Sequence, residues 1–561
     1  MLFLYITLLG CLTLLYLWGN AACAAFRLGQ PRNPFLVCWF GLFCLGVVLI
    51  PVSFCIPLNG ATASGLALVG VLGVPRSLRE VRVLLAGGNR RAGLIFLAGA
   101  LLVVLVVAAA SAYRDWPVHQ YDTDLYHAQV VRWLNSYSLP WGLGNLHSRL
   151  AHGSTWLDMA ALVDNGPWDG RSAWVMAGLL VCLTGLYLLH ELCFSPSIWA
   201  RAYALFLLPL VLFVPESTRP NLYYDTASLN LHCIVILEAL YLWLQSSSER
   251  PSTDGASLLI ALAALSFMIK PLTQITVIAA SLFVLWWLKT RRMLAWRAVI
   301  RVWWLPAVAA VLWVGRNLVV SGWPLFPVPL CPFPFDWTMS FEAVRENYIA
   351  VRGYARMWGE YEAAMRHGIT YWFPAWWDHQ WGKASFRALF LLPLALGGGG
   401  WAWALRRRRE TGMILLLIWQ SATLVGWFVM APDPRFGFGF AWSFGAAGVA
   451  LALRGQAWGP RVVGRWALWG CVVVAVLLGV RLGRDLAKAP HAWLLPGVIP
   501  PRPVAEHILE GGGRPFAVRV PLEGEGGRCG NAELPCAHVV PDNLCLRSGM
   551  MKDGFRLCPM P

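Results

Sequence analysis

The sequence is poor in charged residues. Only 13% of its 561 residues are Asp, Glu, Lys or Arg, against roughly 25% in soluble domains. It is instead 58% hydrophobic, with a mean hydropathy of +0.57, which excludes an ordinary soluble globular protein. A membrane span needs roughly 20 apolar residues, so the chain has room for many spans.

Acidic residues are the scarcer charged class, with 29 Asp and Glu against 45 Lys and Arg and a net charge of +16. Such a balance can indicate nucleic-acid binding. Here, however, the basic residues form short clusters between apolar runs, at 76–91, 289–301, 406–409 and 454–465. The positive-inside rule places clusters of this kind in cytoplasmic loops. We therefore expect a membrane protein with no nucleic-acid partner.

Two further features are missing. Residues 1–25 carry no charged side chain, so they lack the positive start of a signal peptide and predict a retained span. The polar tail has four cysteines but no C-x-x-C spacing, which disfavours zinc. Outside the cytoplasm two disulfides are expected, with three pairings open. The tail cysteines are Cys529, Cys536, Cys545 and Cys558.

The apolar runs predict an all-α polytopic membrane protein with about 13–14 transmembrane helices. Alternating the spans places all four basic clusters in the cytoplasm. Two long polar loops, 113–171 and 321–385, then lie outside. The fourteen runs are 2–25, 35–57, 61–75, 92–112, 172–190, 198–215, 226–245, 256–269, 271–288, 302–320, 386–405, 411–430, 436–453 and 466–483.

The first long loop carries a D-x-D pair, Asp122 and Asp124, followed by His127. Asp124 precedes a short helical pattern as an N-cap would, and His127 follows three residues later on the same helix face. Two carboxylates and a histidine can deprotonate an acceptor or bind a divalent ion. Helix capping is the alternative for Asp124 but does not account for Asp122. His147 in the same loop is a candidate substrate-binding residue.

Basic residues are predicted at or near the outer ends of the spans. A charge within the apolar zone is costly and usually functional, so we expect these residues to converge on a phosphate. Snorkelling to lipid headgroups is the alternative. The residues are Arg219, Lys270, Arg316 and Arg435.

The second loop contains WFPAWWDHQW, residues 372–381. Trp377, Asp378 and His379 are candidates for binding a sugar or a lipid chain. Interfacial anchoring is the alternative for the tryptophans, and Asp378 with His379 is an alternative acid–base pair.

The arrangement resembles the GT-C superfamily of membrane glycosyltransferases. Those enzymes have a seven-span module with an acidic motif in the long external loop after its first span, and a second long loop after its seventh. Counting 92–112 as the first span makes 302–320 the seventh, so the resemblance covers 92–385. The accessory parts are 1–91, 386–483 and an external tail at 484–561. The stretches YDTDLYHAQ, GRNLVVSGWPLFP and APDPRFGFG also resemble a group of largely uncharacterised bacterial membrane proteins.

The resemblance implies a sugar donor linked to polyprenyl phosphate, used on the periplasmic face of the bacterial cytoplasmic membrane. The acceptor hydroxyl belongs to a glycan, lipid or protein. Asp124 is expected as the base, with Asp122 and His127 assisting, and the four basic residues on the phosphate. Whether Asp122 and Asp124 hold Mg or Mn is left open. Alternative functions are an O-antigen polymerase or ligase, a flippase or transporter of lipid-linked saccharides, and a structural subunit of an envelope complex.

Overall fold

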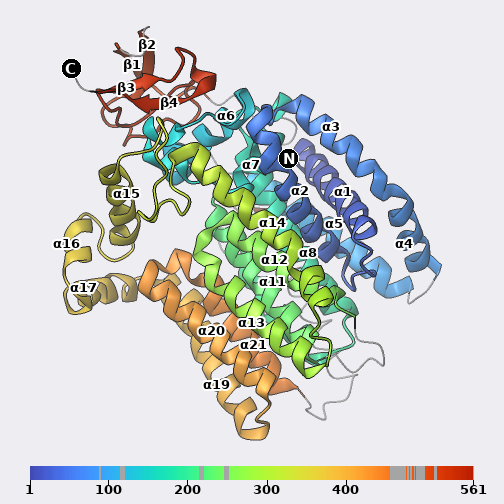
Figure 1. Ribbon diagram of the computed structural model, residues 1–561. Coiled ribbons are helices and arrows are strands. Elements are labelled where there is room, and N and C mark those ends of the chain that lie inside the picture. The colour runs from blue at the N-terminus through green and yellow to red at the C-terminus, as the bar shows by residue number, and fades with distance from the viewer. Residues whose placement is uncertain are drawn as a thin grey trace.

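The computed structural model is a helical bundle with a small strand-containing tail at one end (Figure 1). It describes residues 1–86, 90–113, 121–213, 220–244, 252–454, 500–510 and 515–559, with six isolated positions between 455 and 499.

Nine helices within these ranges are long and apolar enough to cross a membrane, which confirms an all-α polytopic membrane protein. They are Leu2–Ala25 (α1), Pro34–Cys55 (α2), Gly60–Glu80 (from α3, Gly60–Gly70, into α4, Val74–Ala86), Ser172–Phe194 (α8), Tyr224–Leu244 (α11), Pro271–Thr290 (ending in α13, Gln274–Thr290), Trp296–Ser321 (α14), Ala384–Arg407 (α18, Ala384–Phe386, through α19, Leu392–Arg407) and Thr411–Met430 (α20).

Four shorter apolar helices account for most of the remaining predicted runs. They lie in α5 (Arg90–Tyr113), α9 (Ile198–Phe213), α12 (Asp254–Ile269) and α21 (Phe438–Leu453). The last predicted run, 466–483, falls almost entirely outside the described residues.

Burial separates central from peripheral helices. The most apolar 18-residue windows of α8 and α11 are 94% and 83% buried, whereas that of α14 is 17% buried. A helix that is apolar on every side belongs either in a core or against lipid, so α8 and α11 form the centre and α14 faces the membrane. Helices α19 and α21 approach closely at glycines: a Cβ on Gly448 would lie 2.4 Å from the carbonyl oxygen of Gly397, a small-residue contact typical of membrane helices.

Two of the basic clusters meet at one end of the bundle. Arg301 donates hydrogen bonds to Asp254 (2.9 Å) and to the carbonyl of Arg27. Arg76 donates to the carbonyls of Leu28 and Gly29, both at 3.1 Å. The loop at 27–29 therefore joins clusters that the sequence predicts to share one side of the membrane.

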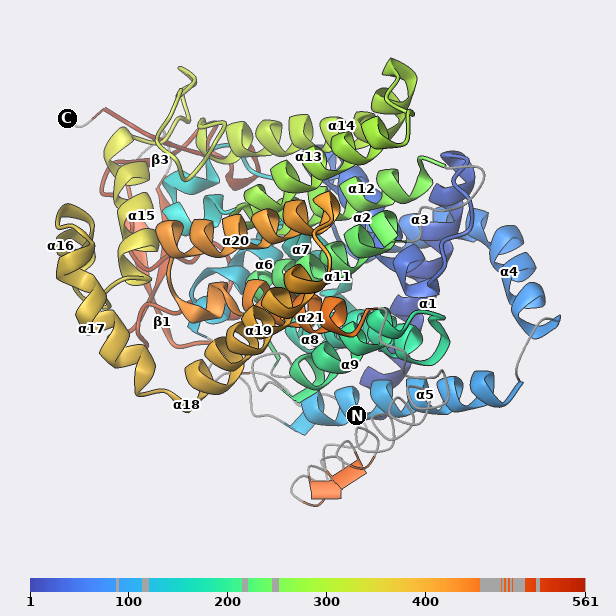
Figure 2. The ribbon, with the colours of Figure 1, turned by 90° about the horizontal axis from the view of Figure 1, so that it is seen from below.

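The two long loops fold into short helices at the opposite end. The first contains a π-helical turn at Thr123–His127, then α6 (Ala128–Ser136) and α7 (Thr155–Val163). The second contains α15 (Phe341–Tyr354), α16 (Tyr361–Arg366) and α17 (Ile369–Trp381). Both views place α15 and the tail at the same end of the bundle (Figures 1 and 2).

The tail consists of two small antiparallel sheets. Strand β1 (Val504–Leu509) pairs with β2 (Phe516–Pro521), and β3 (Leu544–Leu546) pairs with β4 (Phe555–Leu557). Its four cysteines form two disulfides, Cys529–Cys536 and Cys545–Cys558, the sequential pairing among the three left open. The tail packs on the first loop, where the Phe555 amide donates to the Trp141 carbonyl at 2.8 Å.

Candidate functional site

A widened turn carries the D-x-D motif. The amide of Ala128 donates to the carbonyl of Thr123, five residues earlier, so Thr123–His127 is a π-helical turn. Such turns occur frequently at functional sites. In this wider turn, Asp122 interacts electrostatically with His127. The charged groups that interact with Asp124 belong instead to the tail. The expected pairing of Asp124 with His127, based on ordinary helical spacing, is absent from these interactions.

Asp122 is held by an arginine from the other half of the chain. Its carboxylate forms a 3.0 Å ion pair with Arg435, in the turn between α20 and α21. The backbone N–H of Arg435 donates to Asp433 at 2.8 Å, and its guanidinium lies 5.4 Å from the Tyr223 ring centroid. Both ion-pair side chains keep about a quarter of their surface exposed, so a ligand can reach them.

The charges around Asp122 favour its ionised form. Burial alone would raise the pKa of this carboxyl. Electrostatic interactions, with Arg435 first and then with His127, Arg149 and Lys270, act in the opposite direction, and the pKa lies below its ordinary value of 3.8. Asp122 is therefore a carboxylate at neutral pH.

His127 is buried without a hydrogen bond. Its ring packs against Tyr126 and Tyr224, at centroid distances of 4.3 and 4.8 Å, and neither ring nitrogen has a partner among the described residues. Burial lowers the pKa of the imidazole to about 3, so it is neutral at pH 7. An unpaired buried polar group is costly, and a hydrogen bond to a ligand would remove that cost.

Two more basic residues complete the group. Burial, followed by the charge of Arg435, lowers the pKa of Lys270 well below its ordinary value. Lys270 forms an ion pair with Asp225 and lies 4.0 Å from the Phe436 ring centroid. Arg149 is partly buried, and its guanidinium has no hydrogen bond or ion pair in the described part of the chain, although its charge acts on Asp122 and Lys270. We call Asp122, His127, Arg149, Lys270 and Arg435 the loop cluster. Sequence reasoning missed Arg149, whose only signal was its position in the polar first loop.

Arg435 lines the smaller of two adjoining cavities. Their volumes are about 210 and 460 Å³, and both are lined by Gln380, Lys383 and Asp433. The smaller has an apolar wall and is also lined by Asn230, whose buried amide oxygen and nitrogen have no partner among the described residues. The wall consists of Leu229, Phe386, Phe438 and Trp442. The larger cavity adds Tyr354, Arg356, Trp376 and His379. An apolar cavity with a few converging polar groups is typical of a ligand site.

Asp124 has a different environment from Asp122. It is fully buried and forms an ion pair with Arg502 of the tail. Its backbone carbonyl accepts a 2.6 Å hydrogen bond from Gly530. Burial raises the pKa of Asp124 to about 6 despite the opposing charge of Arg502. This residue is bound into the protein and not presented to the cavities.

The arrangement does not fit a divalent ion shared by the two aspartates. Asp122 binds Arg435 while Asp124 binds Arg502. Within the described ranges, no group of three or more His, Cys, Asp or Glu side chains is arranged to hold a metal.

The other predicted site residues are dispersed. Arg316 is buried in an ion pair with Asp158, at 2.5 Å, so its charge is neutralised within the protein. On α17, His379 lines the larger cavity, while Trp377 and Asp378 are exposed.

The two remaining predicted residues lie elsewhere. His147 is near Arg149 and the tail residue His538; burial, reinforced by these two charges, lowers its pKa to about 3. Arg219 lies outside the described residues.

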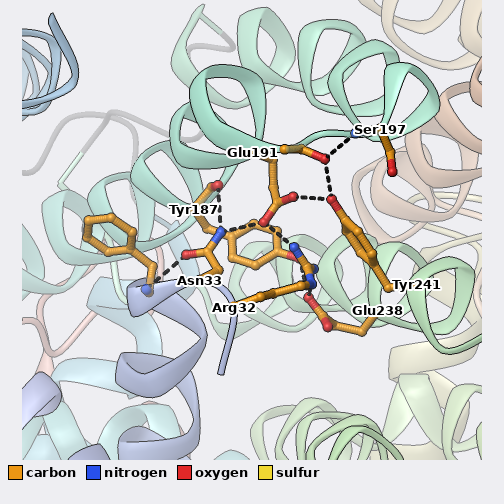
Figure 3. Close-up of polar contacts among 9 residues, drawn as sticks. Arg32, Asn33, Tyr187, Glu191, Ser197, Glu238 and Tyr241 are labelled. Atoms are coloured by element: carbon orange, nitrogen blue, oxygen red, sulfur yellow. Dashed lines mark hydrogen bonds and ion pairs between the residues drawn. The ribbon is translucent and has the colours of Figure 1, made fainter. Parts of the chain in front are cut away.

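A second polar group connects the loop between α1 and α2 with the helices α8 and α11 (Figure 3). Arg32, in the loop between α1 and α2, forms ion pairs with both Glu191 of α8 and Glu238 of α11. Tyr187 donates to Glu238, and Tyr241 donates to Glu191. We call these five residues the glutamate cluster. None of their buried side-chain polar atoms lacks a partner in the structure as described.

Comparison with known proteins identifies a family whose description states no function. The family model described as "Domain of unknown function (DUF8201)" matches residues 1–442. The match covers most of the chain, so the protein belongs to this family. No curated protein matches the chain.

Proposed function

We propose that this DUF8201 protein is a membrane glycosyltransferase. It would move a sugar from a polyprenyl-phosphate donor to an acceptor hydroxyl on the outer face of the bacterial cytoplasmic membrane. One observation carries the proposal: the ionised Asp122 is paired with Arg435, which also lines an amphipathic cavity. A base, a cationic group and an apolar wall are the elements that transfer from a phosphorylated lipid requires.

The cations match a lipid phosphate. Arg435 offers a planar set of donors. A bound phosphate would favour the charged form of Lys270, whose pKa burial otherwise lowers. Arg149 is the cation of the loop cluster without an ion pair among the described residues, so it is available to an anion. The apolar wall beside Arg435 would take the first carbons of the lipid chain.

The reaction follows from these positions. An oxygen lone pair of the acceptor hydroxyl attacks the anomeric carbon, and its proton passes to the Asp122 carboxylate. The bond from the anomeric carbon to the phosphate oxygen breaks, and both of its electrons leave with the phosphate. Arg435 and Arg149 stabilise the departing negative charge.

Asp122 is a better candidate for the base than Asp124. Asp124 is completely buried, and Arg502 occupies its carboxylate, whereas Asp122 is partly exposed beside the cavity. His127 contributes a neutral imidazole with two unused nitrogens, which would orient a hydroxyl of the acceptor or of the sugar.

Reconstitution in liposomes tests the proposal. Purified wild type would be supplied with radiolabelled polyprenyl-phosphate sugars and an extract of envelope glycans and lipids, and transfer would be compared with that of Asp122→Asn. We expect the variant to lose at least about 100-fold in rate. Asp124→Asn should retain most activity, because its amide oxygen can still accept from Arg502. Asp169→Asn, at an exposed acid of the same loop, is the matched control.

Full activity in Asp122→Asn would contradict the assignment of the base. Movement of sugar lipid across the bilayer without transfer would support a flippase instead. Activity that withstands loss of Asp122 but not of His147 or Arg149 would support a polymerase or ligase mechanism.

A further inference from the structure

The disulfide-bonded tail reaches the D-x-D motif, although it lies beyond the region that matches the family. The family match ends at residue 442, and the tail contacts come from residues 502–532. Most bonds of the tail to the π-helical turn and the start of α6 involve backbone atoms of the loop closed by Cys529–Cys536.

The contacts concentrate on the π-helical turn and the start of α6. Gly530 donates its amide to the Asp124 carbonyl at 2.6 Å. In return, Gln129 donates to the carbonyls of Gly530 and Ala532, at 3.1 and 2.9 Å, and Arg132 donates to the carbonyl of Asn531. The guanidinium of Arg502 then binds the Asp124 carboxylate. The tail therefore engages both the backbone of Asp124, through Gly530, and its side chain, through Arg502.

Gly530 has a conformation and surroundings that favour glycine. Its φ is +51°, and a Cβ would lie 2.8 Å from Cγ of Arg502. A larger residue would disturb both the αL backbone and the arginine beside it. The loop and Arg502 thus form one unit.

We infer that Arg502 and the 529–536 loop are positioning elements: they hold the π-helical turn in the form that places Asp122 beside Arg435 and His127 among the tyrosines. The inference rests on the proposed function for its catalytic consequence. An α-helical turn at this point would use i, i+4 bonds and rotate Asp122 and His127 relative to one another. The Asp124 carbonyl, which the tail occupies, is one of the groups that such a turn would need.

Hydrogen–deuterium exchange on the full-length protein tests the structural part without requiring any activity. Arg502→Gln should speed exchange of amides in residues 123–130 by about tenfold, because the turn loses its external support. Arg502→Lys should restore part of the protection. Lys552→Gln, in the same tail, serves as the control: Lys552 is an exposed cation and forms no hydrogen bond or ion pair with the first loop or the 529–536 loop among the described residues.

A second variant removes the loop closure while keeping Arg502. Cys529→Ser with Cys536→Ser should also speed exchange at 123–130. Unchanged exchange at 123–130 in both Arg502→Gln and the double serine variant would overturn the inference, as would faster exchange confined to the tail.

Measurement of kcat and KM distinguishes a positioning role of Arg502 from a role in substrate binding. In Arg502→Gln, kcat should fall by about 100-fold, as expected for a misplaced catalytic group, while KM for the donor stays unchanged and Arg502→Lys recovers part of kcat. If exchange responds as expected but the wild type transfers no sugar, the positioning role stands and the proposed function fails. A rise in KM with unchanged kcat would contradict positioning.

Discussion

The loop cluster and the glutamate cluster are both buried, charged and assembled from distant parts of the chain, but they differ in how completely they are bonded. In the glutamate cluster, Arg32 serves two carboxylates and each carboxylate also accepts from a tyrosine. In the loop cluster, the ring nitrogens of His127 and the guanidinium of Arg149 have no hydrogen-bond or ion-pair partner in the described residues. Complete bonding indicates a structural role, whereas unused polar atoms indicate a group that awaits a ligand.

We expect the largest effect, a loss of stability, from a substitution that breaks the glutamate cluster. Arg32→Ala leaves two buried glutamates without their counter-charge, and removing one partner of a buried ion pair costs about 3–5 kcal/mol. We expect strong loss of folded protein in thermal unfolding, with transfer activity per folded molecule unchanged. Arg79→Ala, at an exposed arginine of α4, should unfold like the wild type. A mild effect of Arg32→Ala would remove the contrast between the clusters.

Substitution of His127 should have the opposite effect to Arg32→Ala: stability is retained and transfer activity is lost. His127→Phe keeps a ring of similar shape among the tyrosines and removes two unpaired nitrogens, so stability should stay the same or rise. Transfer should fall by about 100-fold, as measured by kcat/KM. The control is His190→Phe: this ring packs on Phe96 and Phe194 and should tolerate the change. Marked destabilisation by His127→Phe would show that the histidine is structural.

The smallest effect is a pH dependence that distinguishes the two aspartates. A carboxylate base loses activity as pH falls through its pKa. With Asp122 as base, whose pKa lies below 3.8, kcat/KM should stay level from pH 7 to 5. With Asp124 as base, whose pKa is about 6, activity at pH 5 would drop about tenfold. A pH profile of transfer, with unfolding checked at each pH, decides between them.

The spans and loops were predictable because their signals are local. Apolar runs and basic clusters follow from the physical chemistry of the bilayer, and the tail cysteines indicated two disulfides. Asp122 was visible as a polar residue without a capping role. These features need only neighbouring residues for their interpretation.

The partners of the charged residues were not predictable, since they depend on contacts between distant segments. Arg316 looked available for a phosphate, but Asp158, which lies 158 residues earlier in the chain, neutralises it. Asp124 was paired with His127 by ordinary helical spacing, and the π-helical turn changed that association. No local sequence pattern predicted the π-helical turn, with its extra residue. Nor did one predict the hydrogen bond from Gly530 of the tail to the Asp124 carbonyl.

The contact between Asp124 and Arg502 has a consequence for biosynthesis. The two residues are 378 positions apart, so at about 5–20 residues per second the ribosome adds Arg502 roughly 20–75 seconds after Asp124. Disulfide formation must then close the 529–536 loop. A newly inserted chain therefore has its helices before its motif is supported, and the centre matures only after the tail has been made and oxidised. On the proposed function, such an order would keep nascent chains from acting on lipid-linked sugars during membrane insertion.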